Sequence, residues 1–472
     1  MSSQDFPHQD FTHEDERRFE AYMDALSVVL NHEQRIVPLK GYCTGLLLPV
    51  EGKTMETIAA HLAPDRTLAM HHSLQNFIAD APWSDAAMFD AVRAQVLPAM
   101  LERGAIRSWI VDDTGIPKKG HGSVGVSRQY CGQLGKVDNC QVLVTLSIAN
   151  EVAALPAAAR LYLPEAWVED DERRTRAGVP LDVPFQTKPA IALDQIRAAH
   201  AAGVPPGVVL ADAAYGANAA FRRGVSDLGL SYAVAVPGGV RVVPPADRRQ
   251  ARRFRGRGGP MSARDAAALL GRAAWRWVTW REGTGPELTG RFAMMRVRVA
   301  LDDGPDAREE DQTLLVEWPV GEPDPAGYWL VTLPSGTPLA TVIATAKDRW
   351  WIERGYRELK RDVGLRDFQG RGWRGFHHHV TLCVAAYGFL VMRRCRHPLA
   401  GQVGSPAGNL RYPSVTDPNN PPVRTERHVP WSIRTLRKRL TVGLARRLSR
   451  CPCCQANHPL IPEATPIKRE LQ

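Results

Sequence analysis

The sequence predicts an α/β protein in which helices flank a mixed β-sheet. Between residues 106 and 237, short apolar stretches typical of strands alternate with stretches that have the composition of helices. Residues 1–105 carry apolar side chains at helical spacing, which predicts a helical N-terminal region. In residues 238–338, further stretches alternate polar and apolar side chains, so we expect a β-rich insertion before the last helices of the core.

The N-terminal region contains no obvious cluster of catalytic side chains. We predict helices there at residues 19–30, 54–62, 66–79 and 86–102. The second and third of these flank a turn at Ala63-Pro64-Asp65, which is compatible with a helix-turn-helix that binds DNA. Many helical hairpins share this pattern, so the pattern alone does not establish DNA binding.

The central region predicts the order three strands, helix, strand, helix, strand. We place the strands at residues 106–112, 141–149, 157–163, 207–210 and 231–237, and the helices at 188–202 and 217–228. The first strand is expected to end at the segment Asp-Asp-Thr-Gly of residues 112–115, and the fourth leads directly into Asp212. The glycine-rich segment 120–135 and the charged segment 164–184 are expected to be irregular.

The last part of the chain combines strands, helices and a linker. We expect insertion strands at 291–301, 312–318 and 328–333, an apolar helix at 380–394, a linker at 398–430 and a basic helix at 433–450. An arginine-rich run at 248–257 is expected to form a loop that contacts phosphate groups.

The stretch from Asp348 to Lys360 is predicted to be a helix. At about 100° per residue, positions 349, 353, 356, 357 and 360 fall on one face. That face places the carboxylate of Glu353 between cations on the neighbouring turns. From these residues alone, the helix is either an exposed one with ordinary i,i+4 ion pairs or one whose metal-binding carboxylate is flanked by phosphate-binding cations.

The charge of the chain suits a polyanionic partner. Lys and Arg number 60 against 50 Asp and Glu, so the net charge is 60 − 50 = +10. Nucleic acid is the usual partner of such a basic protein. A basic surface that serves only solubility is the alternative.

The cysteines and the apolar runs predict a reduced protein of the cytoplasm. Eight cysteines are thinly spread over 472 residues, unlike the disulfide framework of a secreted protein. Residues 1–16 are polar and acidic, so we expect no signal peptide. The longest apolar run, residues 380–392, is too short to span a bilayer. We therefore expect a cytoplasmic, nucleoid-associated location and no membrane partner.

Acidic residues follow neighbouring strands of the predicted sheet. Asp112 and Asp113 end the first strand, and Asp212 ends the fourth. Glu353 lies on the helix after the insertion. Because the carboxyl ends of neighbouring strands converge on one crevice, we expect these carboxylates to gather there. Carboxylates hold hard cations such as Mg²⁺, and two such ions stabilise the attacking and leaving oxygens of a phosphoryl displacement.

This ordered set of motifs resembles the DDE transposases of bacterial insertion sequences, which have an RNase-H-like catalytic domain. Within them it is similar to the branch with a β insertion and the signature Tyr-x2-Arg-x3-Glu-x6-Lys. Arg349, Glu353 and Lys360 match this signature, whereas Ala346 stands in place of the tyrosine. Further similarity lies in Val111-Asp112-Asp113-Thr114-Gly115, in Ala211-Asp212-Ala213-Ala214-Tyr215-Gly216 and in residues 370–379. The resemblance covers about residues 105–395.

The resemblance implies an enzyme that cleaves the ends of an insertion sequence and joins them to target DNA. It implies that Asp113, Asp212 and Glu353 hold two Mg²⁺ ions, for which Mn²⁺ can substitute. The cations expected to hold DNA phosphates are Arg349, Arg357 and Lys360. The expected partners are the double-stranded DNA of the terminal repeats and of the target, bound by a homodimer in a synaptic complex.

Five parts of the chain follow from the predicted elements and the resemblance. We expect a helical DNA-binding domain at 1–105, the first part of an RNase-H-like core at 106–237, the β-rich insertion at 238–338, the last helices of the core at 339–397, and a linker with a basic tail at 398–472.

Only one member of the aspartate doublet is expected to face the site, because successive side chains of a strand point to opposite faces. The resemblance implies Asp113, which precedes the threonine, and Asp112 is the alternative first carboxylate.

Other polar and aromatic residues have both a DNA-binding and a structural interpretation. Lys118 and Lys119 either contact phosphate or lie in a solvated loop. Tyr356, Trp373 and His377 are candidates for contacts with a base or a strand, and core packing is the ordinary role of such rings.

The C-terminal cysteines have two interpretations as well. Cys451, Cys454 and His458 provide part of a zinc site that Cys395 and His397 would complete. Simple reduced thiols are the alternative.

Two other functions remain open on the sequence alone. One is a Mg-dependent DNA nuclease, or a domesticated relative, that cleaves without joining. The other is a catalytically inactive DNA-binding regulator whose acidic residues are structural. Mg²⁺-dependent nicking separates an enzyme from a binding protein, and joining of a cut end separates a transposase from a nuclease.

Overall fold

The structure is a computed structural model that describes residues 11–245, 259–281, 287–300, 309–396, 431–446 and 448. Several predictions lie outside these residues: the arginine-rich loop, the linker, and the proposed zinc ligands His397, Cys451, Cys454 and His458. Within the described residues, no helix combines the length and the hydrophobicity that crossing a membrane requires.

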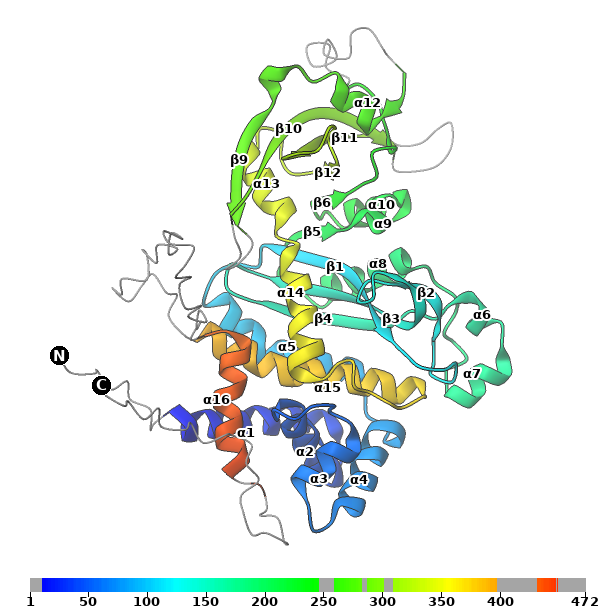
Figure 1. Cartoon of the computed structure of the whole chain (residues 1–472), viewed down its shortest axis with the longest axis vertical. Helices are drawn as coiled ribbons and strands as arrows, with labels where there is room; N and C mark the ends of the chain where they lie inside the picture. The colour runs from blue at the N-terminus through cyan, green and yellow to red at the C-terminus, as the bar shows by residue number, and fades with distance from the viewer. Residues whose placement is uncertain are drawn as a thin grey trace, which may run out of the picture. The chain divides into compact units, whose positions relative to one another are not determined.

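The chain divides into two compact units (Figure 1). Unit 1 comprises Met1–Arg103, Glu358–Gln369 and Thr381–Gln472, and unit 2 comprises Gly104–Arg357 and Gly370–Val380. Each unit therefore draws on segments that are far apart in the sequence.

Unit 1 is helical, as predicted for the N-terminal region. Its helices are α1 (Phe11–Ser27), α2 (Ile36–Leu47), α3 (Met55–Leu62), α4 (Thr67–Gln75), α5 (Asp85–Leu101), α16 (Ile433–Arg446) and most of α15 (Trp373–Cys395). The hydroxyl groups of Thr54 and Ser84 accept backbone N–H groups at the starts of α3 and α5, which explains where these helices begin. Helix α2 was not predicted. It packs closely on α3, where a Cβ at Gly45 would lie 2.3 Å from the Ile58 side chain.

The apolar helix predicted at 380–394 is the buried centre of unit 1. The rings of Phe19 and Phe389 pack edge to face at 5.1 Å between centroids. The Tyr22 hydroxyl donates to the Ala385 carbonyl oxygen at 2.9 Å. α15 therefore belongs to a protein core, as the short length of its apolar run, residues 380–392, indicated.

Unit 2 is built on a large mixed sheet, so the predicted α/β, RNase-H-like fold class is confirmed. Its strands are β1 (Ser108–Pro117), β2 (Ser127–Cys131), β3 (Lys136–Ala149), β4 (Ala154–Leu161), β5 (Val208–Ala211), β6 (Tyr232–Ala235), β9 (Arg276–Arg281), β10 (Glu287–Ala300), β11 (Glu309–Pro319) and β12 (Gly327–Val331). The strand order is β2-β3-β1-β5-β6-β12-β11-β10-β9, and β4 pairs with β3. β1, β5 and β6 are parallel to one another, and the other pairs are antiparallel.

The insertion strands β9 to β12 extend the core sheet. β12 pairs with β6 through Trp329↔Ala235, Leu330↔Val234 and Val331↔Ala233. The β-rich insertion is thus joined to the core by backbone hydrogen bonds. A separate two-stranded sheet is formed by β7 (Arg241–Val242) and β8 (Met261–Ser262).

The prediction that the first strand ends at Asp112 was wrong. The parallel ladder with β5 does end at Ile110, but the antiparallel ladder with β3 continues to Pro117. The aspartate doublet therefore lies inside β1, just beyond the last residue paired with β5. The segment 120–135 was also not wholly irregular, because it contains β2.

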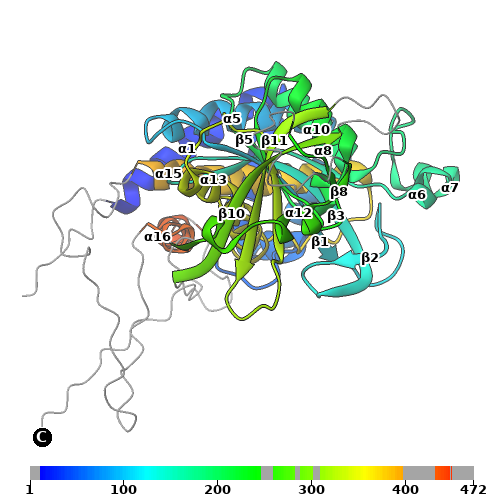
Figure 2. The same cartoon turned by 90° about the horizontal axis from the view of Figure 1, so that it is seen from above.

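Short and long helices flank the sheet of unit 2. They are α6 (Glu165–Val168), α7 (Asp171–Ala177), α8 (Lys188–Ala201), α9 (Ala213–Gly216), α10 (Ala219–Asp227), α12 (Ala263–Ala268), α13 (Leu339–Lys347) and α14 (Trp350–Glu358). The segment expected to be irregular at 164–184 contains α6 and α7, which lie near β2 at the margin of the unit (Figure 2). A hydrogen bond of 2.8 Å from the Trp167 indole to the Val126 carbonyl oxygen holds them there.

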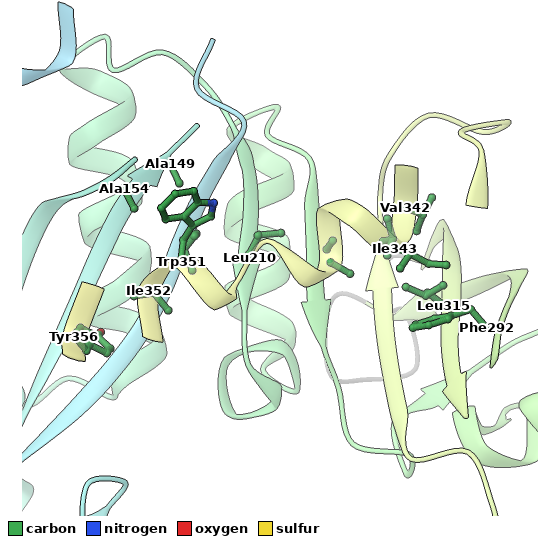
Figure 3. Packing of buried hydrophobic residues seen from close by; sticks show 14 residues of the cluster. Ala149, Ala154, Leu210, Phe292, Leu315, Val342, Ile343, Trp351, Ile352 and Tyr356 are labelled. Atoms are coloured by element: carbon green, nitrogen blue, oxygen red, sulfur yellow. The ribbon is translucent and has the colours of Figure 1, made fainter. Parts of the chain in front are cut away.

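Helices α13 and α14 cover one face of the sheet (Figure 3). Val342 and Ile343 of α13 pack with Leu315 of the insertion, and Trp351 of α14 packs with Leu210 of the core. The helix predicted at 348–360 is interrupted at both ends. Two turn residues, 348 and 349, separate α13 from α14, and a π-helical turn (Leu359–Val363) follows α14.

Candidate active site at the carboxyl edge of the core strands

Arg349 lies at the centre of a group of carboxylates. Its Nη2 atom is 3.2 Å from Asp112 Oδ2 and 3.9 Å from Asp212 Oδ2. Its Nη1 atom is 2.9 Å from Glu353 Oε1. Three carboxylates from β1, the end of β5 and α14 therefore surround one guanidinium group, at the edge where the sequence predicted a site.

The two members of the aspartate doublet face opposite sides of the sheet. Asp112 is paired in register with Thr145, whose hydroxyl lies 2.7 Å from the Tyr356 hydroxyl of α14. Asp112 thus faces α14. Asp113 Oδ2 lies 3.1 Å from Lys188 Nζ at the start of α8, so it faces the other side.

Asp212 is held by the start of the short helix α9. Its Oδ1 atom accepts the backbone N–H groups of Ala214 at 2.9 Å and Tyr215 at 3.4 Å. An aspartate at this N-cap position satisfies backbone groups that would otherwise lack partners. The same contacts leave Oδ2 directed toward Arg349.

Burial sets the electrostatics of Asp112 and Arg349. It raises the pKa of the Asp112 carboxyl to about 7, against the opposing effect of the Arg349 guanidinium. Burial also lowers the pKa of Arg349, but the carboxylates of Asp112, Asp212 and Glu353 outweigh it, and the pKa of Arg349 is raised. The guanidinium therefore stays charged and balances the carboxylates around it.

Lys188 and Tyr215 are site residues that the sequence analysis did not identify as such. The Tyr215 hydroxyl donates to Asp113 Oδ2 at 3.2 Å. Burial, with the nearby Asp113 carboxylate, raises the pKa of Tyr215 well above its usual value, so the hydroxyl keeps its proton. Tyr215 lies in a motif that the sequence analysis had noted, but nothing in the local sequence connects Lys188 with Asp113.

The donor set fits a hard cation. Asp112, Asp212 and Glu353 offer carboxylate oxygens, which such ions prefer, and they already converge on one positive group. Among the described residues, no group of three or more His, Cys, Asp or Glu side chains is arranged as a metal site, and at this position the Arg349 guanidinium lies between the three carboxylates.

Residues 25–287 match the family described as DDE superfamily endonucleases. This chain belongs to that family. Endonucleases of the family generally use divalent metal ions. The matched range includes Asp112, Asp113 and Asp212, and it ends before Glu353.

The chain is also similar to a protein of an insertion sequence element. A probable transposase for insertion sequence element IS701 from Microchaete diplosiphon is 31% identical over 193 residues. The match covers 41% of this chain and 46% of that protein, so it spans about half the length of the relative.

The other cations predicted from the family resemblance lie in different places. Arg357 is exposed on α14, one turn after Glu353. Lys360 lies beyond α14, in the π-helical turn that belongs to unit 1. Lys119 is exposed after β1, and Lys118 is partly buried there, with its backbone N–H donating to the Asn139 carbonyl oxygen at 3.0 Å.

The aromatic and histidine side chains that were predicted to contact DNA are largely buried in unit 2. Tyr356 is 8% exposed and lies in the core beside Thr145, whereas Glu353 is exposed. At about 60° from Glu353 on the helix, its large ring reaches the sheet. His377 is 7% exposed, and its Nε2 accepts the Leu161 N–H at 3.3 Å while Nδ1 donates to the Trp373 carbonyl oxygen at 3.0 Å. Trp373 itself is partly buried.

Proposed function

We propose that this protein is a transposase that cleaves the ends of an insertion sequence and joins them to target DNA. The observation that carries the proposal is the convergence of Asp112, Asp212 and Glu353 on Arg349. Asp113 follows Asp112 on β1 and contacts Lys188 on the other side of the sheet. Membership of an endonuclease family and 31% identity to a probable transposase support this reaction.

Asp113, Asp212 and Glu353 are the proposed ligands of two Mg²⁺ ions, for which Mn²⁺ can substitute. Asp113 is assigned from the family resemblance, whereas the carboxylate of the doublet that contacts Arg349 is Asp112. The side chains of the three proposed ligands are 23%, 38% and 58% exposed, so a ligand and a DNA phosphate can reach them. The side chain of Asp112 is only 11% exposed. Divalent ions bound there would stabilise charge on the attacking and leaving oxygens of an in-line displacement.

Asp112 is proposed to position Arg349. Its Oδ1 accepts the backbone N–H of Asp113 at 2.8 Å, and its Oδ2 meets the guanidinium group. Arg349 is proposed to bind a DNA phosphate, as a guanidinium group can through two parallel hydrogen bonds. Arg357, Lys360, Lys118 and Lys119 are proposed as further phosphate contacts, by their charge.

Double-stranded DNA is the proposed partner, in the form of the terminal repeats and the target. We assign binding of the element ends to the helical region 1–105 and to the exposed cations Arg434 and Lys438 of α16. A homodimer in a synaptic complex, with both element ends bound, accounts for paired cleavage. The proposed location is the cytoplasm, in association with the nucleoid.

The test combines the purified protein with a plasmid that carries the DNA flanking its own gene. With Mg²⁺ we expect strand cuts at the element ends and joined products, and with EDTA we expect neither. A variant with Asp113→Asn and Glu353→Gln is the matched control and should bind without cutting. Cleavage without joining would favour the nuclease alternative. Binding without any cleavage by the unaltered protein would contradict the proposal and favour a regulator.

A further inference from the structure

Three consecutive charged residues form the corner between α13 and α14, and each bonds to a different part of unit 2. Lys347 Nζ contacts both carboxylate oxygens of Glu317 on β11, at 2.9 and 2.8 Å. Asp348 Oδ2 accepts the Ser108 hydroxyl at the start of β1 at 3.2 Å. Arg349 contacts the carboxylates of the site. The corner is therefore fixed to the insertion, to the core and to the site at once.

The ammonium group of Lys347 is enclosed by aromatic rings of the insertion. It lies 4.7 Å from the ring centroid of Trp280, 5.0 Å from that of Trp329 and 5.6 Å from that of Phe292. These rings come from β9, β12 and β10, so three insertion strands meet at one lysine. Distances of this size permit attraction between the cation and the ring faces.

The Lys347–Glu317 pair is largely removed from water. The side chains are 18% and 12% exposed. A charge in such a place is tolerated only with a well-aligned partner, so the geometry of the pair is tightly restricted. We call Lys347, Glu317, Trp280, Phe292 and Trp329 the corner cage.

The backbone of β12 leaves room for the corner cage. A Cβ at Gly327 would lie 2.6 Å from the Trp329 ring and 2.9 Å from Glu317 Oε2. Only glycine lets both side chains occupy their observed positions. Gly327 is therefore part of the structure that holds the lysine.

We propose that the corner cage positions the active site, and that this is a function of the insertion strands. Only residue 348 separates Lys347 from Arg349, and α14, which carries Glu353, begins directly after Arg349. Movement of Lys347 would therefore change where both residues point. Misplacement of a reacting group by about 1 Å can lower a rate about 10²-fold. This proposal rests on the proposed DNA cleavage.

The test replaces the charges without leaving one of them alone in the core. We use the double variant Lys347→Met/Glu317→Gln, and Gly327→Ala as an independent disturbance of the same cage. Arg197→Gln, in an exposed ion pair with Asp194 on α8, is the matched control. Cleavage of end DNA is measured as kcat and KM, and hydrogen exchange is measured for α14 and for α8.

We expect kcat to fall about 10- to 100-fold in both cage variants, with KM for DNA unchanged. Hydrogen exchange in residues 350–358 should become about tenfold faster, while exchange in residues 188–201 stays as in the unaltered protein. Arg197→Gln should change neither quantity.

Two results would overturn the proposal. One is a normal kcat in both cage variants. The other is an equal increase of exchange in α14 and α8, which would mean that the cage contributes only to the stability of the whole unit. If the unaltered protein cleaves no DNA, the proposed function fails, whereas the exchange comparison still decides whether the cage holds α14.

Discussion

Asp112 and Asp113 are neighbours in the chain but lie in different environments. Asp112 is buried against Arg349, and its carboxyl has a pKa of about 7 because burial penalises its charge. Asp113 is more open and is held by Lys188 and Tyr215 from the other face of the sheet. Two carboxylates with such different surroundings are suited to different tasks, one structural and one exposed to a ligand.

Removal of single carboxylates tests this division at the level of residues. We expect Asp113→Asn, Asp212→Asn and Glu353→Gln each to lower Mg²⁺-dependent cleavage at least about 10³-fold, because groups that act as a unit fail together. DNA binding, measured by gel shift, should be retained. Asp112→Asn should lower cleavage about 10- to 100-fold, as expected for a residue that positions Arg349.

The controls for this prediction come from neighbouring carboxylates. Glu358 is one turn beyond Glu353 and accepts the Tyr387 hydroxyl at 2.8 Å, so Glu358→Gln should leave cleavage almost unchanged. An inactive Glu358→Gln beside an active Glu353→Gln would contradict the assigned helix position. An inactive Asp112→Asn beside an active Asp113→Asn would make Asp112 the metal ligand.

Arg349→Gln should reduce both activity and stability. Without the guanidinium to hold the phosphate, cleavage should fall about 10²-fold. The buried Asp112 is also left without its charged partner, which should lower the free energy of unfolding by about 1–3 kcal/mol. Chemical denaturation measures this change. Arg357→Gln, at an exposed position of α14, is the control and should change stability by less than about 0.5 kcal/mol. Equal stability of Arg349→Gln and the unaltered protein would contradict the assigned ion pairs.

At the level of elements, the short helix α9 positions Asp212 and depends on a close contact with β6. A Cβ at Gly216 would lie 1.9 Å from the Ala235 carbonyl oxygen, so no other residue fits without moving the backbone. We expect Gly216→Ala to lower the free energy of unfolding by about 3 kcal/mol and to lower cleavage.

Gly355→Ala on α14 is the matched control for this substitution. No atom lies within 4 Å of the position its Cβ would take. Because alanine favours a helix more than glycine does, we expect the free energy of unfolding to increase by about 1 kcal/mol. Thermal or chemical denaturation measures this change. A tolerated Gly216→Ala would mean that α9 does not pack on β6 as observed.

Lys53 of unit 1 joins the end of α2 to the π-helical turn Leu359–Val363 through a buried ammonium group. Its Nζ atom donates to the carbonyl oxygens of Leu46, Leu48 and Asp362. Burial lowers the pKa of Lys53 to about 7, from its usual value of 10.5. The folded protein therefore binds fewer protons than the unfolded chain between these pH values, and stability rises with pH there.

We expect the free energy of unfolding of the native protein to increase between pH 7 and pH 9 relative to that of Lys53→Met. The difference in free energy of unfolding between the two proteins should grow by at most about 1.4 kcal/mol per pH unit. Urea denaturation at the two pH values measures it. Lys40→Met is the control, because its partners Asp24 and Glu20 raise the pKa of Lys40, and its titration falls above this range. Parallel pH profiles of the native protein and Lys53→Met would contradict the prediction.

At the level of the whole molecule, the net charge of +10 predicts a strong salt dependence of DNA binding. Neutralisation of six to ten phosphates would reduce affinity about 10³- to 10⁵-fold between 50 and 200 mM salt. Titration of the protein with end DNA at several salt concentrations measures the slope. A flat response would exclude DNA as the main polyanionic partner.

The exposed cations of α16 provide a second measurement of the same property. Arg434→Gln/Lys438→Gln should reduce the slope of log affinity against log salt by about 0.9 for each phosphate that the protein no longer neutralises. Arg437 on the same helix pairs with Asp362 at 3.3 Å and is largely buried, so it should affect stability more than the slope.

Local patterns in the sequence were sufficient for the fold class and for the stretches that carry the carboxylates. The helix predicted at 188–202 is Lys188–Ala201, because Thr187 caps it and Pro189 lies in its first turn. The short apolar strand before Asp212 was also predicted within one residue at each end. Such elements have their periodicity, caps and turn residues within their own length, so an isolated sequence contains the information.

Tertiary structure decided how far the strands extend and which residues meet. β1 continues through the doublet because β3 pairs with it as far as Pro117, and α2 forms where Gly45 lets it approach α3. Arg349 reaches Asp112 from 237 residues along the chain. The side of the sheet that each aspartate faces depends on which side α14 and α8 pack against, and residues 112–115 contain no local signal of that choice. Non-local pairing and packing therefore determined the site, while local periodicity determined the elements that build it.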